Sequence, residues 1–253
     1  MLMMTCPKCA HAQNPANTEC AKCGIVFEKY YRLREARNNT AGAEADGAED
    51  ANGIFAGVIM HVPDTTNIVY VCGRALVLLA VFLWGWTFIL ASPAGNAAGN
   101  SFMHLVNLPF HEAGHIFFGI FGQFIGALGG SLGQLIIPCV CLLVLLLKTR
   151  DPFGASVALW WLGQNFIDLA PYINDARSLT LPLLGGNTGG SSPYGFHDWQ
   201  FILTELHLLK YDHTLAGLSH GLGCAVMLTA CLWGAAVLVK QYSNREGTTR
   251  GGP

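Results

Sequence analysis

Charged side chains are scarce in this sequence. They make up 12% of its 253 residues, whereas they form about a quarter of an ordinary soluble domain. The hydrophobic share is 52%, and the mean hydropathy is +0.39. The net charge of −2 provides no strongly basic surface for nucleic acid, so none is expected as a partner. The composition therefore predicts an integral membrane protein in contact with a lipid bilayer.

A secretory signal is also lacking at the N-terminus. Residues 1–10 contain two cysteines and a lysine, but no apolar core of the length that such a signal requires. We therefore expect the N-terminus to lie in the cytoplasm, and we place the protein in a bacterial inner membrane.

Two Cys-x-x-Cys pairs lie close together near the N-terminus, Cys6 with Cys9 and Cys20 with Cys23. Thiolates on two such turns can complete one tetrahedral zinc site. A redox pair is the alternative, but the thioredoxin-like pattern that would favour it is missing. The segment resembles the zinc-ribbon family. That resemblance implies a small module over residues 1–37 with one structural zinc, and a docking site for a cytosolic protein partner.

The rest of the chain divides into three parts by composition. Residues 38–66 are predicted to form a flexible linker and a pre-membrane segment, because the small, acidic stretch at their start has little apolar surface to bury. Residues 67–241 predict an all-α polytopic membrane domain, and residues 242–253 a disordered tail.

About four to five segments of this domain are candidates for spanning the membrane. The glycine-rich residues 122–133 are predicted to form a re-entrant loop or a hairpin. Positive charges at Lys148, Arg150 and Lys240 favour the cytoplasmic side. That pattern requires one segment not to cross fully, and the second is the natural candidate. The candidate segments are residues 68–90, 102–121, 135–147, 153–173 and 215–239.

The second of these segments contains His111-Glu112-Ala-Gly-His115. Histidines four residues apart lie on one face of a helix, so both imidazoles can bind one metal ion. Glu112 follows the first histidine and suits the role of a general base acting on water. A chance match is the alternative. Ionisable groups at membrane depth are costly, however, which favours a functional metal site.

A catalytic zinc site takes a third protein ligand. Asp175 is the first candidate, because it follows the apolar segment that ends near residue 173. Asp168 is the alternative, and His197 and Asp198 are further candidates. His197 and Asp198 also suit an outer-shell role at the start of an amphipathic helix predicted over residues 198–211.

The His-Glu-x-x-His motif, the glycine-rich stretch after it, and Asp168-Leu-Ala-Pro171 followed by Asp175 resemble the site-2 protease family of intramembrane zinc metalloproteases. The resemblance covers residues 102–176. It implies that Glu112 is the general base, that His111, His115 and Asp175 hold zinc, and that Asn165 or Asn174 contacts substrate. In that family an Asn takes the place of Asp168.

Three functions follow from these features. The first is a zinc-dependent endopeptidase that cuts membrane-anchored protein substrates, with an unwound substrate pairing as a strand with the glycine-rich segment. The second is a non-catalytic zinc-binding membrane scaffold. The third, a membrane di-iron oxidoreductase, is disfavoured because adjacent histidines are missing from the sequence.

Overall fold

The computed structural model describes residues 3–35, 53, 56–63, 66–184, 186–191 and 197–249, with side chains described as far as residue 244. Two compact units divide the chain, Met1–Gly57 and Val58–Pro253. Most of the predicted linker, including residues 38–52, lies outside the described residues.

The N-terminal unit is small and is built around four cysteines. Strand β1 (Met4–Thr5) pairs antiparallel with β2 (Ala12–Gln13). An isolated bridge joins Glu19 to Val26, and residues 27–35 are helical. Its buried centre consists of Cys6, Cys20 and Phe27. So few apolar residues form only a minimal core, which is typical of small modules stabilised by a metal ion.

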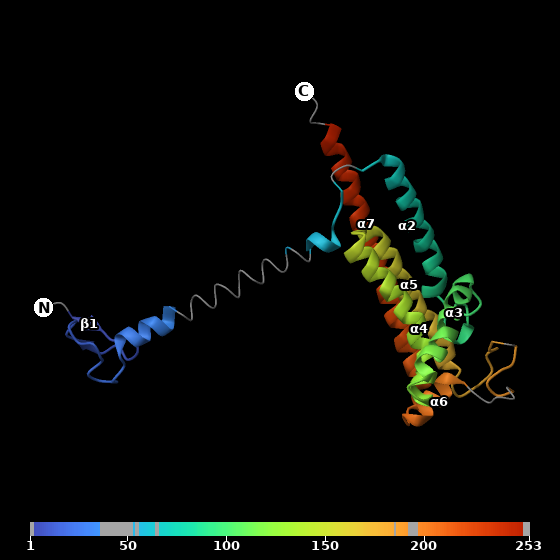
Figure 1. Cartoon of the computed structure of the whole chain (residues 1–253), viewed down its shortest axis with the longest axis horizontal. Coiled ribbons are helices and arrows are strands. Elements are labelled where there is room, and N and C mark those ends of the chain that lie inside the picture. Colours follow the sequence, from blue (N-terminus) through green and yellow to red (C-terminus); the bar gives the residue numbers. More distant parts are fainter. Residues whose placement is uncertain are drawn as a thin grey trace. The chain divides into compact units, whose positions relative to one another are not determined.

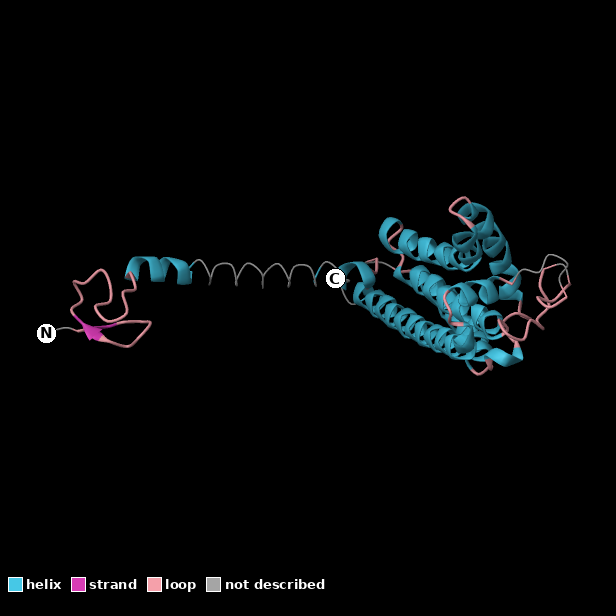
Figure 2. Cartoon of the chain, turned by 90° about the horizontal axis from the view of Figure 1, so that it is seen from below, coloured by secondary structure: helices cyan, strands magenta, loops and turns pink. Residues whose placement is uncertain are grey.

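The second unit is entirely helical in its described long elements (Figures 1 and 2). Side-chain caps mark several of its helix starts: Asn67, Ser101 and Asp151 each accept a hydrogen bond from a backbone N–H of the first turn. The elements are α2 (Ile68–Ile89), η1 (Pro93–Gly95), α3 (Phe102–Gly119), α4 (Gln123–Leu143), η2 (Val144–Lys148), α5 (Pro152–Asn174), α6 (Asp198–Glu205), η3 (Leu209–Tyr211) and α7 (Asp212–Thr249).

Helix α5 is the centre of this unit. It packs along α7 and also contacts α2 and α4. Its Trp160 and Ile167 lie in a buried cluster with Phe88 of α2 and Met227 of α7. The polar side chains of α5 are therefore enclosed by other helices instead of facing lipid.

Three described stretches are long and apolar enough to cross a membrane, judged by length and composition: Ile68–Ile89, Gln123–Lys148 and Leu209–Asn244. This is compatible with an integral membrane protein, but the number is smaller than the four to five that we expected. The segments that do not qualify are α3 and α5, because each carries several polar side chains along its length. Their polar side chains face neighbouring helices and a cavity.

The glycine-rich segment does not form the predicted re-entrant loop or hairpin. Residues 123–133 are the first half of the continuous helix α4. Their glycines allow α4 to lie directly against α3. A Cβ atom at Gly114 of α3 would overlap the carbonyl oxygen of Gly129, and a Cβ at Gly133 would overlap that of Phe110. Glycine is required at these positions, because a larger residue would force the two helix backbones apart.

Other boundaries also differ from the prediction. The last helix continues to Thr249, so residues 242–249 of the expected disordered tail are helical. Part of the expected linker packs on the second unit, where Val62 is buried and the Trp233 indole N–H donates to the Ile59 carbonyl at 3.0 Å. The predicted amphipathic helix over residues 198–211 is split into α6 and η3, with His207 between them at a positive φ of 57°.

The contact between α3 and α4 can be tested with two alanine substitutions. Gly114→Ala should lower the apparent melting temperature of the detergent-solubilised protein, because the new methyl group overlaps the α4 backbone, and overpacking typically costs about 1–3 kcal/mol. Gly119→Ala is the matched control, because a Cβ at this position meets nothing within 4 Å. The control should be neutral or slightly stabilising, since alanine favours helix. Equal melting temperatures for the two variants would contradict close α3–α4 packing.

Candidate metal centre

His111 and His115 are positioned by helix α4. His111 Nδ1 lies 2.8 Å from the side-chain oxygen Oε1 of Gln134, and His115 Nδ1 lies 2.8 Å from the carbonyl oxygen of Gly126. Both oxygens accept hydrogen bonds, so each Nδ1 carries its proton and each Nε2 keeps a lone pair. Such outer partners commonly orient metal-binding histidines.

Both Nε2 atoms face the same carboxylate. Asp198 Oδ2 lies 3.3 Å from His111 Nε2 and 3.2 Å from His115 Nε2. Two lone pairs facing a carboxylate repel one another unless protons or a metal ion lie between them. Ligand atoms around a tetrahedral zinc with bonds of about 2.0–2.1 Å are separated by about 3.3 Å. The observed spacing therefore fits one metal ion held by His111, His115 and Asp198.

The α4 backbone leaves room for this ion. A Cβ atom at Gly130 would lie 2.5 Å from Nε2 of both histidines. Any side chain there would therefore overlap both histidine nitrogens. Gly130 keeps that space open.

Asp198 is held from the other side by Tyr172 of α5. The Tyr172 hydroxyl donates to Asp198 Oδ2 at 3.1 Å and accepts the backbone N–H of Asp198 at 3.1 Å. Burial raises the pKa of the Asp198 carboxyl, but its contacts with His111 and His115 outweigh this and lower the pKa to about 2. The carboxylate therefore stays ionised, as a metal ligand must be.

Asp175 is not the third member of this group, contrary to our expectation. Its carboxylate accepts hydrogen bonds from Ser178 Oγ at 2.6 Å, from the Thr180 backbone and hydroxyl at 2.9 and 3.0 Å, and from the Leu181 N–H at 3.0 Å. Burial raises the pKa of Asp175, but these donors outweigh it and the pKa is lowered. Its carboxylate oxygens are thus occupied by hydrogen bonds that hold the loop after α5.

Asp168, the alternative third ligand, is also occupied elsewhere. Both of its carboxylate oxygens lie 3.1 Å from His104 Nδ1, and Asn107 Nδ2 donates to one of them at 2.9 Å. Trp161 Nε1 and Gln164 extend this buried network through the Asn107 amide. Asp168 thus belongs to a second polar cluster, the His104–Asp168 cluster.

The metal centre opens into a cavity of about 970 Å³. Glu112 lines this cavity beside His111 and His115, as the motif predicts, and His104 and Asp168 lie on its wall. Its other lining includes the loop residues Leu181, Pro182, Leu183 and Leu184. Asn165 and Asn174, the predicted substrate contacts, do not line it. The amide of Asn165 donates to the Trp161 carbonyl instead.

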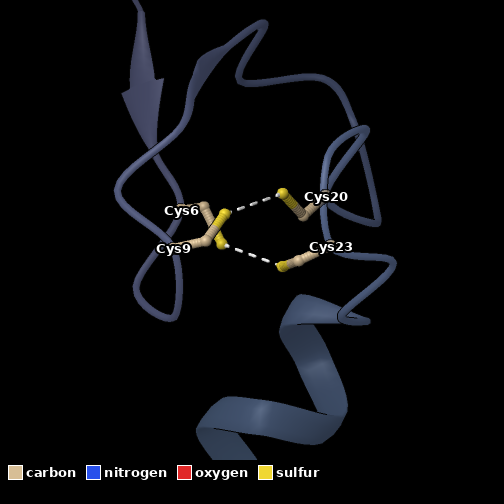
Figure 3. Close-up of side chains that lie close together, drawn as sticks. All are labelled: Cys6, Cys9, Cys20 and Cys23. Carbon is tan, nitrogen blue, oxygen red and sulfur yellow. Dashed lines mark hydrogen bonds between the residues drawn. The ribbon is translucent and has the colours of Figure 1, made fainter.

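The four cysteines of the N-terminal unit form a second group of metal-binding type (Figure 3). Cys6 Sγ lies 3.7 Å from Cys23 Sγ, and Cys9 Sγ lies 3.6 Å from Cys20 Sγ. Sulfur atoms around a tetrahedral zinc with bonds of about 2.3 Å are about 3.8 Å apart. The cluster therefore fits one metal ion.

Sequence reasoning missed three contributors to the metal centre: Gln134, Gly130 and Tyr172. A buried glutamine within the apolar run of α4 was a usable signal, because such a side chain requires a hydrogen-bond partner. The role of Gly130 depends on packing between two helices, and sequence alone does not report it. The chain matches no protein-family model, no curated protein and no solved structure.

Two aspartate variants test which carboxylate completes the centre. Asp198→Ala should lower the bound metal by one ion per chain, measured by elemental analysis of the purified protein, because the remaining two imidazoles bind weakly alone. Asp175→Ala should retain that ion while lowering thermal stability, because its carboxylate organises a loop. The opposite pattern, with metal lost only in Asp175→Ala, would contradict the arrangement.

Gly130→Ala tests the centre without removing a ligand. The added methyl group would occupy the space between the two Nε2 atoms, so the helical unit should lose its metal ion while the four-cysteine cluster keeps its own. Elemental analysis measures this, and Gly119→Ala is the control that adds the same methyl group in open space. Full metal content in Gly130→Ala would show that the ion does not sit between His111 and His115.

Proposed function

We propose that the chain is an intramembrane zinc metallopeptidase that hydrolyses peptide bonds of membrane-anchored protein substrates. The observation that carries this proposal is the convergence of His111, His115 and Asp198 beside Glu112 in one cavity. The arrangement agrees with what the resemblance to the site-2 protease family implies, with one change. Here the acidic ligand comes from α6 and not from the end of α5.

Each residue has a definable part in the reaction. When bound, zinc lowers the pKa of water and polarises a carbonyl group. Glu112 accepts the proton of the attacking water and delivers it to the leaving amine nitrogen. Tyr172 keeps Asp198 oriented toward the two imidazoles, while Gln134 and the Gly126 carbonyl fix which histidine nitrogen carries a proton.

The substrate path proposed from the sequence needs revision. Because residues 123–133 are helical, they offer no free strand edge. The cavity wall contains a short extended segment instead, where Pro182 forms a bridge with Thr188. An unwound substrate segment would enter beside residues 181–184, between apolar side chains and the metal ligands.

The N-terminal unit has a separate part in this proposal. Its four cysteines would hold a structural zinc ion, and the unit would serve as a docking site for a cytosolic protein partner. Burial raises the pKa of the Cys20 thiol, but the backbone N–H groups of Cys23 and Lys22 and the neighbouring Cys23 and Cys6 side chains outweigh it and lower the pKa to about 6. The lowered pKa favours the metal-binding thiolate. We place this end of the chain in the cytoplasm, with the helical unit in a bacterial inner membrane.

Glu112→Gln tests the catalytic role. This nearly isosteric change should leave the metal content unchanged and reduce cleavage of a tagged single-span membrane protein by about 10²–10⁴-fold, the usual contribution of a general base. Both proteins would be reconstituted together in liposomes and cleavage followed by electrophoresis. Glu205→Gln, an exposed change on α6, is the control.

The possible outcomes separate the candidate functions. Undiminished cleavage by Glu112→Gln would remove the general base from the mechanism. Loss of the metal in that variant would make Glu112 a ligand. A fully metallated parent protein that leaves every single-span reporter intact would favour the non-catalytic scaffold.

A further inference from the structure

A second cavity lies at the opposite end of the helical unit from α6. Its lining comes from the start of α2, the junction between η2 and α5, and the C-terminal part of α7, which meet at one end of the bundle (Figure 1). The cavity measures about 1180 Å³. It shares no lining residue with the cavity of the metal centre.

Among its described lining residues, positive charge exceeds negative charge. Two arginines, Arg74 and Arg150, line it together with one aspartate, Asp151. Arg74 is neutralised, because its guanidinium donates to Asp151 Oδ1 at 2.8 Å and lies over the Tyr70 ring at 4.2 Å from the centroid. Arg150 takes part in none of the ion pairs found among the described residues. Among the described lining residues, one positive charge is therefore left for an anion.

The same cavity contains polar atoms without a partner. Gln241 is 1% exposed, and its side-chain oxygen Oε1 has no hydrogen-bond partner among the described residues. The hydroxyl oxygen of Thr66 is also buried and also lacks a hydrogen-bond partner among the described residues. A buried amide oxygen without a donor costs about 1–3 kcal/mol. Both residues line this cavity, so a ligand that carries hydroxyl groups would satisfy them.

The flank of the cavity is apolar and exposed. Val69 is 73% exposed and Val77 is 45% exposed, both on the outer face of α2, and Leu145 lines the cavity from η2. These side chains belong to helices that are long and apolar enough to cross a membrane. A soluble anion would leave this surface uncovered, whereas acyl chains would cover it.

We propose that this cavity binds the headgroup of an anionic phospholipid that carries hydroxyl groups, of the phosphatidylglycerol class. The phosphate would lie against Arg150, the headgroup hydroxyls would reach Gln241 and Thr66, and the acyl chains would follow α2. Basic pockets between membrane helices commonly bind anionic lipids. The proposal is independent of peptidase activity.

Native mass spectrometry of the full chain in detergent tests this. The protein would be titrated with phosphatidylglycerol, phosphatidic acid, phosphatidylcholine and inorganic phosphate. We expect one tightly bound phosphatidylglycerol, weaker phosphatidic acid, little phosphatidylcholine, and no displacement by millimolar phosphate.

Three variants locate the site. Arg150→Asn removes the free charge with a residue that tolerates the positive φ of 51° found at this position, and it should weaken phosphatidylglycerol binding about fivefold. Lys210→Asn is the matched control, because it removes a cation from η3 at the other end of the bundle. Gln241→Leu should weaken phosphatidylglycerol and leave phosphatidic acid unchanged, because only the former has headgroup hydroxyls.

The contrary results are distinct. Equal affinity for phosphatidylglycerol and phosphatidylcholine would contradict a site for anionic lipid. Equal loss of phosphatidylglycerol affinity in Arg150→Asn and Lys210→Asn would contradict its location in this cavity. If inorganic phosphate competes with the lipid and Arg150→Asn abolishes that competition, the cavity is a site for small anions, and the proposal that it binds a phospholipid is wrong. Equal effects of Gln241→Leu on both anionic lipids would overturn the headgroup contact.

Discussion

The direct backbone contact between α3 and α4 is the constraint on which the metal centre depends. Glycines at positions 114, 129 and 133 let the two helices touch without side chains between them. At that distance Gln134 and the Gly126 carbonyl reach the outer nitrogens of the histidines. Gly130 then leaves an opening where the inner nitrogens converge. A wider spacing would break both outer hydrogen bonds, and a larger residue at Gly130 would close the opening.

The second constraint is the cost of burying polar groups in an apolar bundle. The His104–Asp168 cluster shows how the chain meets it. The carboxylate is shared by an imidazole and an amide, and that amide also bonds to Gln164 and Trp161. Hydrogen-bonded networks of this kind favour one packing arrangement over others. Helix α5 carries several of these polar side chains, so its composition is too polar for a membrane span. It can still lie at the centre of the unit, because these side chains bond to neighbouring helices.

The predictable parts of this protein are the local ones. The two Cys-x-x-Cys turns and the His-Glu-x-x-His face follow from spacing along the chain, and the structure brings each set together. The glycine-rich segment was misjudged, because glycine lowers helix propensity while permitting a helix contact that outweighs this loss. The number of spans was overestimated for a related reason. Apolar composition does not reveal whether a polar helix face is turned toward lipid or toward protein.

The third ligand shows most clearly where sequence reasoning stops. Asp175 directly follows the apolar segment that forms α5, whereas Asp198 comes after a polar, glycine-rich stretch, so position along the chain favoured Asp175. The structure gives them linked tasks. Asp175 fixes the loop after α5, and its Oδ2 lies 3.6 Å from His197 Nε2.

His197 connects these two tasks. Its Nδ1 accepts the Gln200 N–H and caps α6, which requires the proton to be on Nε2, the nitrogen that faces Asp175. Burial lowers the pKa of His197 and keeps it neutral, despite the opposing effect of the nearby carboxylates. The ring also packs against Tyr172, which holds Asp198 directly. Asp175 therefore acts one step removed, by positioning through His197 the short helix α6 that carries Asp198 into the candidate metal centre.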